Sequence, residues 1–341
     1  MINAKTLKQC VGALIACAFM SGTALAQTID KIRIIGTLPL GHHMTEALRI
    51  FKKEVEANTD KKLKVDIFPA GQLYNDSDAV KVIPTGAVDM GVVQLDMWAG
   101  LVPSAGILYM PTYYKNLEHY YAVRDFVSPE IAKDLAAKGN VKLLGWADYD
   151  AEALISKKQI LKLEDFHGTK LRGYGEYAAS FLQAVGSSPV VMSSSEAYDA
   201  MSKGTIDGTM SGPTSHLSRK FYEVGKYLIT QPSFIQPVLS YAILINLDTW
   251  KKLSPQAQQA VEAAATKVQV FTRDAFQDAS AKATVALEKN GLSIDKEIEP
   301  AEFERIKKAV WPVLEKKYQD QVGTAQARPI LDKVNELRGK Y

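Results

Sequence analysis

The sequence contains an internal repeat, and the repeat limits the folds that the chain can adopt. Two segments 118 residues apart share a serine, an acid and an alanine, then a glycine, then an apolar residue followed by aspartate. The two copies are Ser77-Asp78-Ala79 with Gly86 and Val88-Asp89, and Ser195-Glu196-Ala197 with Gly204 and Ile206-Asp207. Each copy is typical of a capped helix, a glycine stop and a short strand. The repeat therefore predicts two similarly built α/β lobes with a ligand cleft between them.

The composition fits a globular chain large enough for two such lobes. The 341 residues are 47% hydrophobic and 23% charged, an ordinary balance for a protein with two cores. The 41 basic and 38 acidic residues leave a formal net charge of +3 and are spread along the chain. Because no Lys/Arg block or basic–aromatic stripe occurs, the charge pattern predicts no nucleic-acid partner.

The N-terminus predicts export. Lys5 and Lys8 precede an apolar run over residues 11–20, and Ala24-Leu25-Ala26 forms a small-residue cleavage site. This order of basic, apolar and small residues is typical of a secretory signal peptide. We therefore expect residues 1–26 to be a signal peptide that is cleaved after Ala26, and the mature protein to be periplasmic.

Both cysteines of the chain lie inside this signal peptide. Cys17 also ends a segment, residues 14–17, that resembles a lipoprotein cleavage box. That alternative leaves a lipid-anchored Cys17, but it shortens the apolar run and ignores the downstream cleavage site. Without Cys10 and Cys17 the mature chain has no disulfide, so its stability depends on its core, as in large bacterial periplasmic domains.

Hydrophobic periodicity predicts alternating strands and helices along the mature chain. We expect strands at residues 31–36, 63–68, 88–93, 141–146, 153–156, 170–172, 189–192 and 241–246. We expect helices at residues 44–58, 117–138 and 176–185, besides those of the repeat. In the second copy of the repeat, Ser193-x-x-Glu196 has the pattern of a capping box.

A long helix near the C-terminus is expected to connect the lobes. Ser254-Pro255 is a good helix start and Asn290-Gly291 a good stop, so the helix would run about 50 Å. That length exceeds one lobe. With crossing strands in place of a flexible linker, we expect lobe I to comprise residues 27–149 plus 238–277, and lobe II residues 150–237 plus 278–341.

Arg172 is a candidate ligand-binding residue. It ends a predicted strand and is followed by Gly173-Tyr174-Gly175, and the carboxyl ends of strands in open α/β sheets face the ligand crevice. A guanidinium there binds a carboxylate through two parallel charge-assisted hydrogen bonds. Position alone, however, favours the alternative, a structural salt bridge.

Aromatic and histidine side chains also fall at predicted strand ends. Four aromatic residues at this edge make an aromatic-lined pocket as plausible as ordinary packing; they are Trp98, Trp146, Tyr149 and Tyr174. His42 and His43 lie between the first strand and its helix, so one imidazole, for which we select His43, is a candidate for lining the cleft. The alternative for this pair is helix capping or exposure to solvent.

The sequence offers little support for an enzyme. Gly173-x-Gly175-x-x-Ala178 matches a relaxed dinucleotide fingerprint, but serine, rather than an acid, ends the next strand. The five histidines show no HExxH spacing, and no Gly-x-Ser-x-Gly elbow places a nucleophile. We therefore expect no catalytic residue, no metal and no cofactor.

An ordered set of motifs resembles the DctP-type solute-binding proteins of tripartite ATP-independent periplasmic (TRAP) transporters, over essentially the whole mature chain. The motifs are Pro69-Ala70-Gly71-Gln72-Leu73, Gly86-x-x-Asp89-Met90-Gly91, Asp165-x-x-Gly168-x-Lys170-x-Arg172, Val185-Gly186-x-x-Pro189-Val190-x-Met192 and Glu196-x-Tyr198-x-Ala200-Met201-x-x-Gly204-x-x-Asp207-Gly208. Each motif is modest, but the ordered set is specific.

The resemblance implies a two-lobed periplasmic-binding-protein-like fold that closes on an organic acid and delivers it to membrane permease subunits. The family arginine that pairs with the ligand carboxylate falls on Arg172, which overturns the structural interpretation. Gln94 and Ser194 fall on further cleft positions. We expect hinge closure of a monomer, with the acid on Arg172 and Tyr174 in lobe II, and with Gln94 and Trp98 completing the pocket from lobe I.

Two positions depart from the pattern of sialate- and dicarboxylate-binding members. Glu152 stands where many carry a second arginine, and Ser211 where many carry asparagine. The missing guanidinium favours a monocarboxylate. Glu152 either receives a hydroxyl or amino group of the ligand or pairs with a neighbouring Lys or Arg. The rival functions are an exported α/β enzyme acting on an organic acid and the ligand-binding subunit of a sensor or chemotaxis system.

Overall fold

One mixed sheet carries the chain through both lobes. The computed structural model describes residues 29–230, 235–295 and 297–341, so the predicted signal peptide lies outside the described residues. The strands are β1 Lys31–Gly36, β2 Lys64–Phe68, β3 Met90–Val93, β4 Val141–Ser156, β5 Lys170–Gly173, β6 Ser188–Val191, β7 Gly208–Ser211, β8 Tyr227–Ile229, β9 Gln236–Asn246 and β10 Ser293–Asp295. Their order is β2-β1-β3-β9-β4-β7-β5-β6, with β8 paired to β4 and β10 to β8.

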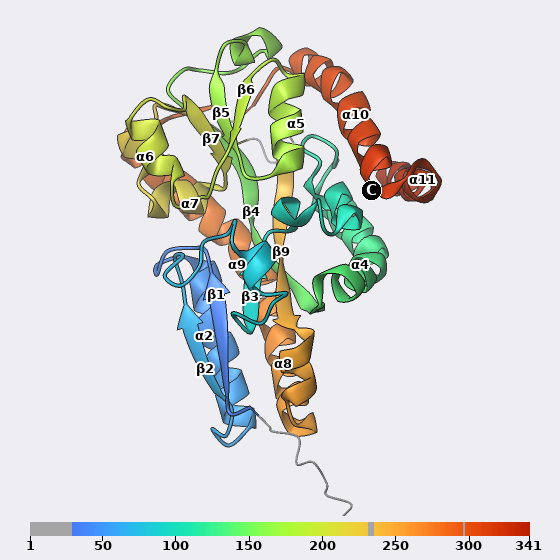
Figure 1. The fold of residues 1–341 in the computed structure, drawn as a ribbon. Coiled ribbons are helices and arrows are strands. Elements are labelled where there is room, and N and C mark those ends of the chain that lie inside the picture. Colours follow the sequence, from blue (N-terminus) through green and yellow to red (C-terminus); the bar gives the residue numbers. More distant parts are fainter. Residues whose placement is uncertain (1–28, 231–234, 296) are drawn as a thin grey trace, which may run out of the picture.

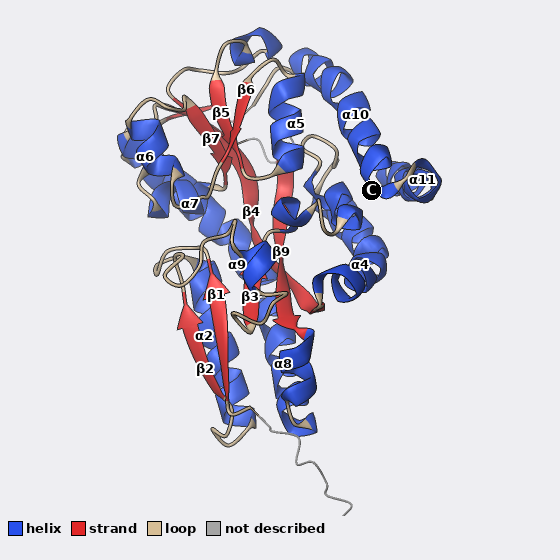
Figure 2. Ribbon diagram, in the orientation of Figure 1, coloured by secondary structure: helices blue, strands red, loops and turns tan. Residues whose placement is uncertain are grey.

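Helices surround this sheet at both ends (Figures 1 and 2). They are α2 His43–Asn58, α3 Ala79–Val82, α4 Leu117–Gly139, α5 Glu176–Ala184, α6 Ala197–Ser202, α7 Pro213–Ser218, α8 Leu247–Lys252, α9 Pro255–Lys289, α10 Pro300–Val322 and α11 Thr324–Lys340. Short 3-10 turns add η1 Leu95–Trp98, η2 Pro103–Tyr109, η3 Leu163–Phe166 and η4 Phe221–Glu223. None of the described helices has the length and apolarity needed to cross a membrane.

The repeat forms equivalent units in the two lobes, as predicted. In lobe I, α3 leads to β3, which is parallel to β1. In lobe II, α6 leads to β7, which is parallel to β5. Parallel strands place their carboxyl ends at one edge of a sheet, so each lobe presents one such edge. The mixed α/β, two-lobed architecture expected from the sequence is confirmed.

The strand β4 corrects the sequence-based prediction of two strands separated by a loop. It runs without interruption for 16 residues, pairing with β9 in its first part and with β7 and β8 in its last four residues. The acidic and aromatic segment between the predicted strands lies in the part with register shifts at Asp148, Asp150 and Glu152. These carboxylates are buried and most of their oxygens accept hydrogen bonds, so polarity here marks a bulged crossing strand.

The long helix α9 connects the lobes as predicted. Its 35 residues contact α2 and β4 on one side of the crossing and α7 and β10 on the other. Ser254 caps its start by accepting from the Ala257 N–H at 3.2 Å. Gly291 follows its end with φ of +95°, a left-handed conformation that suits glycine. The C-terminal helices also contact both lobes, because α10 packs on α5 and η2 while α11 packs on α4.

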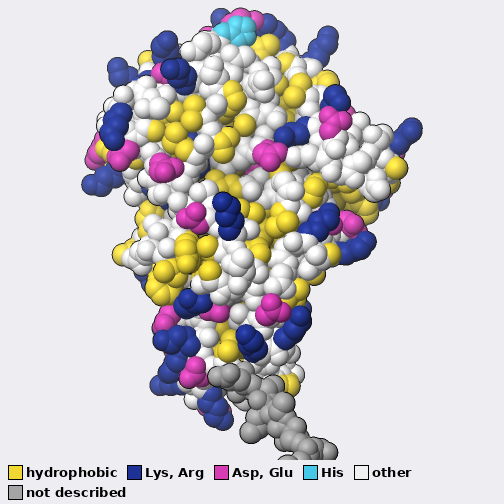
Figure 3. Space-filling model, in the orientation of Figure 1, with side chains coloured by type: hydrophobic (Ala, Val, Ile, Leu, Met, Phe, Trp, Pro, Cys, Tyr) yellow, Lys and Arg dark blue, Asp and Glu magenta, His cyan; other side chains and the backbone are white. Residues whose placement is uncertain are grey.

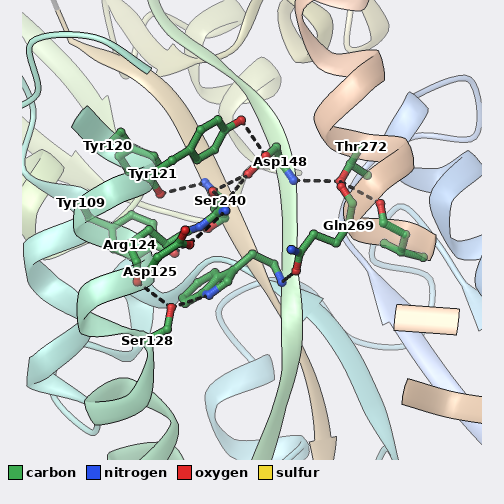
Figure 4. Close-up of polar contacts among 12 residues, drawn as sticks. Tyr109, Tyr120, Tyr121, Arg124, Asp125, Ser128, Asp148, Ser240, Gln269 and Thr272 are labelled. Atoms are coloured by element: carbon green, nitrogen blue, oxygen red, sulfur yellow. Dashed lines mark hydrogen bonds and ion pairs between the residues drawn. The ribbon is translucent and has the colours of Figure 1, made fainter. Parts of the chain in front are cut away.

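A buried polar network joins the crossing strands to their flanking helices (Figure 4). Asp148 of β4 accepts from Arg124 of α4 at 2.9 Å, from the Tyr121 hydroxyl at 2.7 Å and from the Ser240 hydroxyl of β9 at 2.6 Å. Its backbone N–H donates to Thr272 of α9 at 3.0 Å. Arg124 and Asp148 are each only 1% exposed. The network therefore fixes β4, β9, α4 and α9 together where the chain passes between lobes.

Candidate ligand-binding site

Arg172 lies at the end of β5 with its guanidinium held by backbone carbonyls. Nε and Nη2 donate to the Met192 carbonyl at 3.1 and 3.0 Å, and Nη1 donates to the Met210 carbonyl at 3.3 Å. A guanidinium has five N–H donors, so one remains on each terminal nitrogen. The side chain is buried, at 3% exposed, and both partners are neutral. Arg172 is thus a fixed, buried cation with two adjacent donors still available.

Glu152 of β4 lies near this cation. Its Oε2 accepts from the Tyr174 hydroxyl at 2.7 Å, while the buried Oε1 has no hydrogen-bond partner. Burial raises the pKa of Glu152 well above its usual value and Asp96 acts in the same direction, while the Tyr174 hydrogen bond and the nearby Arg172 oppose the rise. The unpartnered Oε1 is a place where a polar group of a ligand can bond.

Two lobe I residues follow β3 at the same boundary. The Nε2 of Gln94 is buried and has no hydrogen-bond partner. Asp96, two residues on, is fully buried and accepts from the N–H groups of Tyr177 at 3.0 Å and Ala178 at 3.4 Å. It therefore caps α5 of lobe II from lobe I. A Cβ at Gly175 would lie 2.5 Å from this carboxyl group, so the glycine is required for the close approach.

Burial is the main influence on the Asp96 carboxyl group. It raises the pKa of Asp96 from 3.8 to about 7, with Glu176 acting in the same direction. The two α5 N–H groups and the Lys317 cation act in the opposite direction. The sequence analysis did not select Asp96, because its partners lie 81 and 82 residues away.

Hydrogen bonds between the lobes form a group that we call the clasp, consisting of Thr37, Asp76, Ser193, Ser194 and Arg219. Ser193 Oγ and the Ser194 N–H donate to the two oxygens of Asp76 at 2.5 and 3.2 Å. Arg219 Nη2 donates to the Thr37 carbonyl at 2.6 Å and to Ser194 Oγ at 3.2 Å. The clasp shows the lobes closed on one another.

The predicted capping box is half formed. Glu196 accepts from the Ser193 N–H at 3.2 Å, while the Ser193 hydroxyl donates to Asp76 instead of capping the helix.

The two histidines lie against the other side of the boundary. His42 both caps α2, accepting from the Met44 N–H, and bonds to Thr214 of α7 at 2.8 Å. His43 Nε2 lies 3.4 Å from the Asp148 carbonyl, and its Nδ1 is buried without a partner. Burial lowers the pKa of both imidazoles, so both are neutral at pH 7 and provide no cation for an acid.

The predicted aromatic edge is only partly present. Tyr149 lies at the boundary, sharing a hydrogen bond with Ser211 Oγ at 2.9 Å and packing 5.1 Å from Tyr241. Trp98 is instead fully buried in the large core that lobe I contributes to, where a Cβ at Gly139 would meet its ring at 3.8 Å. Trp146 likewise points to α4, donating to Ser128 at 2.9 Å. The turn η1 directs Trp98 inward, which a strand-end argument does not foresee.

Hollows at the boundary are lined from both lobes. One of about 390 Å³ lies between Ser77 and Met97 of lobe I and Gly175, Met192 and Ser193 of lobe II. A second of about 840 Å³ lies between the β1–α2 connection and α7 and α9.

Charged side chains of both signs are interspersed over the face that Figure 3 shows. In the described part of the chain, no group of three or more His, Cys, Asp or Glu side chains is placed to hold a metal ion.

Comparisons with known proteins identify the family of the chain. The family model for bacterial extracellular solute-binding protein family 7, DctP, matches residues 36–321. The C4-dicarboxylate-binding periplasmic protein DctP of Rhodobacter capsulatus is 25% identical over 296 residues, 86% of this chain and 87% of that protein.

Solved structures show the same fold. A TRAP periplasmic solute-binding protein from Citrobacter koseri with bound D-glucuronate is 26% identical, has a TM-score of 0.80 and covers 89% of this chain and 99% of its own. One from Desulfovibrio salexigens with bound orotic acid is 20% identical with a TM-score of 0.84, covering 92% and 99%, and shows the fold alone. The chain therefore belongs to bacterial extracellular solute-binding protein family 7 (DctP), and it is a solute receptor of the TRAP type rather than an enzyme.

Proposed function

We propose that the mature protein is a periplasmic receptor that binds a small organic acid on Arg172 and delivers it to TRAP permease subunits. The observation that carries this proposal is the arrangement of Arg172, a buried guanidinium with two free adjacent N–H groups and only neutral partners. A buried charge without a counter-ion is costly. A ligand carboxylate supplies that counter-ion through two parallel hydrogen bonds.

The ligand class that fits best is a monocarboxylate rich in further oxygen atoms. Near Arg172, Glu152 Oε1 lacks a partner, and so does Gln94 Nε2 across the boundary; together they match hydroxyl or carbonyl groups rather than hydrocarbon. D-glucuronate and orotic acid, bound by two solved relatives, each have one carboxylate and several other oxygens. Tyr174, Ser194 and Ser211 would then position these groups, and His43 would border the pocket.

Binding would act by closure about the crossing elements β4, β9 and α9. The lobes would be residues 27–149 plus 238–277 and residues 150–237 plus 278–341, after removal of residues 1–26. The clasp, the Asp96 cap on α5 and the His42–Thr214 hydrogen bond join groups from opposite lobes. An acid that contacts both lobes favours the closed state by its differential affinity, and the closed monomer would be the form that the permease binds.

A thermal-shift screen of the purified mature protein against several hundred organic acids tests this function. An acid that binds only the folded state stabilises it by mass action and so raises Tm. At a free acid concentration of 100 times Kd, the free energy of unfolding increases by about 2.7 kcal/mol. We expect oxygen-rich carboxylates to raise Tm of the wild type, and we expect this effect to vanish in Arg172→Gln. The control is Arg305→Gln, in which the effect should remain, because Arg305 is a surface residue paired with Glu164 and Glu302. Stabilisation by neutral sugars, nucleotides or metals without any acid contradicts the proposal.

A further inference from the structure

The structure contains a second cleft guanidinium that the sequence pattern did not reveal. The second arginine expected at position 152 is glutamate, but Arg219, which directly follows α7, reaches the same boundary. Its Nη2 donates to the Thr37 carbonyl of lobe I and to Ser194 Oγ of lobe II. Its Nε–H is buried and has no partner. An unsatisfied buried donor is unfavourable, so an acceptor added at this atom would stabilise the protein.

The surroundings of Arg219 are polar but do not neutralise it by contact. Burial lowers the pKa of Arg219, and Arg172 acts in the same direction, while Asp76 opposes the shift. The oxygens of Asp76 are engaged by Ser193 and Ser194. The Arg219 guanidinium therefore has an unused buried donor, and its hydrogen bonds within the described part of the chain reach no carboxylate.

Both guanidinium groups bond to the same short segment. Arg172 bonds to the carbonyl of Met192, and Arg219 bonds to the hydroxyl of Ser194, two residues further on. Two residues of extended chain span at most about 7 Å, so the two bonded positions lie close together. An acid whose carboxylate lies on Arg172 would direct its remote part toward Arg219.

We propose that Arg219 is a specificity-determining residue of this receptor, which donates its Nε–H to a hydroxyl or carbonyl oxygen on the part of the acid remote from the carboxylate. This proposal rests on the proposed function, because it assigns one end of the ligand to Arg172. It predicts a preference for acids that carry oxygens remote from the carboxylate over acids that lack them. The competing role, in which Arg219 serves only the clasp, predicts an equal loss for every acid when Arg219 is replaced.

The test compares D-glucuronate with glycerate, which has a carboxylate and hydroxyl groups but no oxygen beyond its third carbon. Dissociation constants are obtained from ligand-dependent Tm shifts of the wild type, Arg219→Gln, Arg172→Gln and Lys220→Gln; Lys220 is a neighbouring exposed cation. We expect Arg219→Gln to weaken D-glucuronate about 10- to 100-fold, the range for a hydrogen bond to a charged group, and glycerate less than threefold. Lys220→Gln should weaken neither acid.

Other results overturn the inference in distinguishable ways. Equal weakening of both acids in Arg219→Gln assigns Arg219 to the clasp alone, and no weakening of either removes it from the site. Binding of glycerate but not D-glucuronate by the wild type also contradicts the inference. In each of these cases, loss of binding in Arg172→Gln keeps the proposed function intact. If no acid of the whole screen stabilises the wild type, the proposed function fails and this inference fails with it. Circular dichroism and the ligand-free Tm establish that each variant is folded.

Discussion

At the scale of single residues, the proposed ligand site consists of buried polar groups whose partners within the protein are incomplete. Arg172 retains two donors, and Glu152, Gln94 and Arg219 each retain one buried unpaired atom. Buried polar atoms are almost always paired in folded proteins, so their gathering at the lobe boundary indicates a place for a polar ligand. Similar unpaired atoms elsewhere, such as Arg338 Nε, are not gathered from two lobes.

Asp96 makes stability depend on pH in a direction opposite to that of an ordinary paired carboxylate. The pKa of Asp96 rises from 3.8 to about 7 on folding because of burial. A raised pKa means that the folded state binds the proton more tightly than the unfolded state. The contribution of this proton binding to the free energy of unfolding is therefore lost as pH rises from about 4 to about 7. The full effect is about 4 kcal/mol.

Asp96→Asn removes this titration while keeping one acceptor for the α5 N–H groups. We expect the free energy of unfolding of Asp96→Asn, relative to wild type, to increase as pH rises from 4 to 7, measured by urea denaturation at several pH values. The comparison between variants cancels the opposite contribution of His216, whose pKa burial lowers to about 3. A relative stability that stays constant with pH would show that Asp96 is ionised throughout.

The sequence could propose candidate site residues only where local pattern or family resemblance identified them. Arg172 lies at the end of β5 beside a glycine pair, but position alone favoured a structural role, and it was the family resemblance that made it a ligand candidate. Asp96 and Arg219 were missed because their partners are distant, with Arg219 and Thr37 separated by 182 residues. Trp98 was misplaced because a short turn after β3, invisible in the periodicity, directs it into the core. Local patterns identify where a strand ends. They do not identify whether the side chain that follows points into its own core or toward the other lobe.

At the scale of elements, β4 is the least predictable and the most consequential. Its polar middle segment resembles a loop in sequence, yet each acid accepts hydrogen bonds from a different neighbour: Asp148 from α4 and β9, Asp150 from Thr214 of α7 at 2.9 Å, and Glu152 from Tyr174. Helix α9, by contrast, was predicted to within one residue because proline, serine and glycine mark its ends. Capping is encoded locally, whereas burial of acids depends on long-range partners.

The network of Figure 4 is expected to determine the stability of the crossing strands. Asp148→Asn leaves the Arg124 guanidinium buried without its counter-ion, and such changes cost about 3–5 kcal/mol. We expect a corresponding decrease in the free energy of unfolding by urea. Asp125→Asn is the matched control, because Asp125 is 70% exposed and lies 3.6 Å from the same arginine; its loss should cost at most about 1 kcal/mol. Equal costs would contradict the assignment of Asp148 as the main partner.

At the scale of the whole molecule, the two lobes are connected by continuous elements and joined by hydrogen bonds of side chains. The crossing strands and α9 are continuous between lobes, while the clasp and the His42–Thr214 bond are side-chain contacts. This division of roles is what hinge closure requires. The repeat was enough to predict two lobes, but the contacts that join them involve residues just before each copy, such as Asp76 and Ser194, whose pairing over 118 residues had to come from the structure.

The central claim is that an acid is held between the lobes by the Arg172 fork. Isothermal titration calorimetry of the best-stabilising acid, on the wild type and on Arg172→Lys, tests it most directly. Lysine keeps the positive charge but lacks the planar pair of donors, so the claim predicts a Kd at least about 100-fold weaker, given about 1.5–3 kcal/mol for each charge-assisted bond. Arg305→Lys should bind as the wild type does. An unchanged Kd in a folded Arg172→Lys protein would contradict the claim.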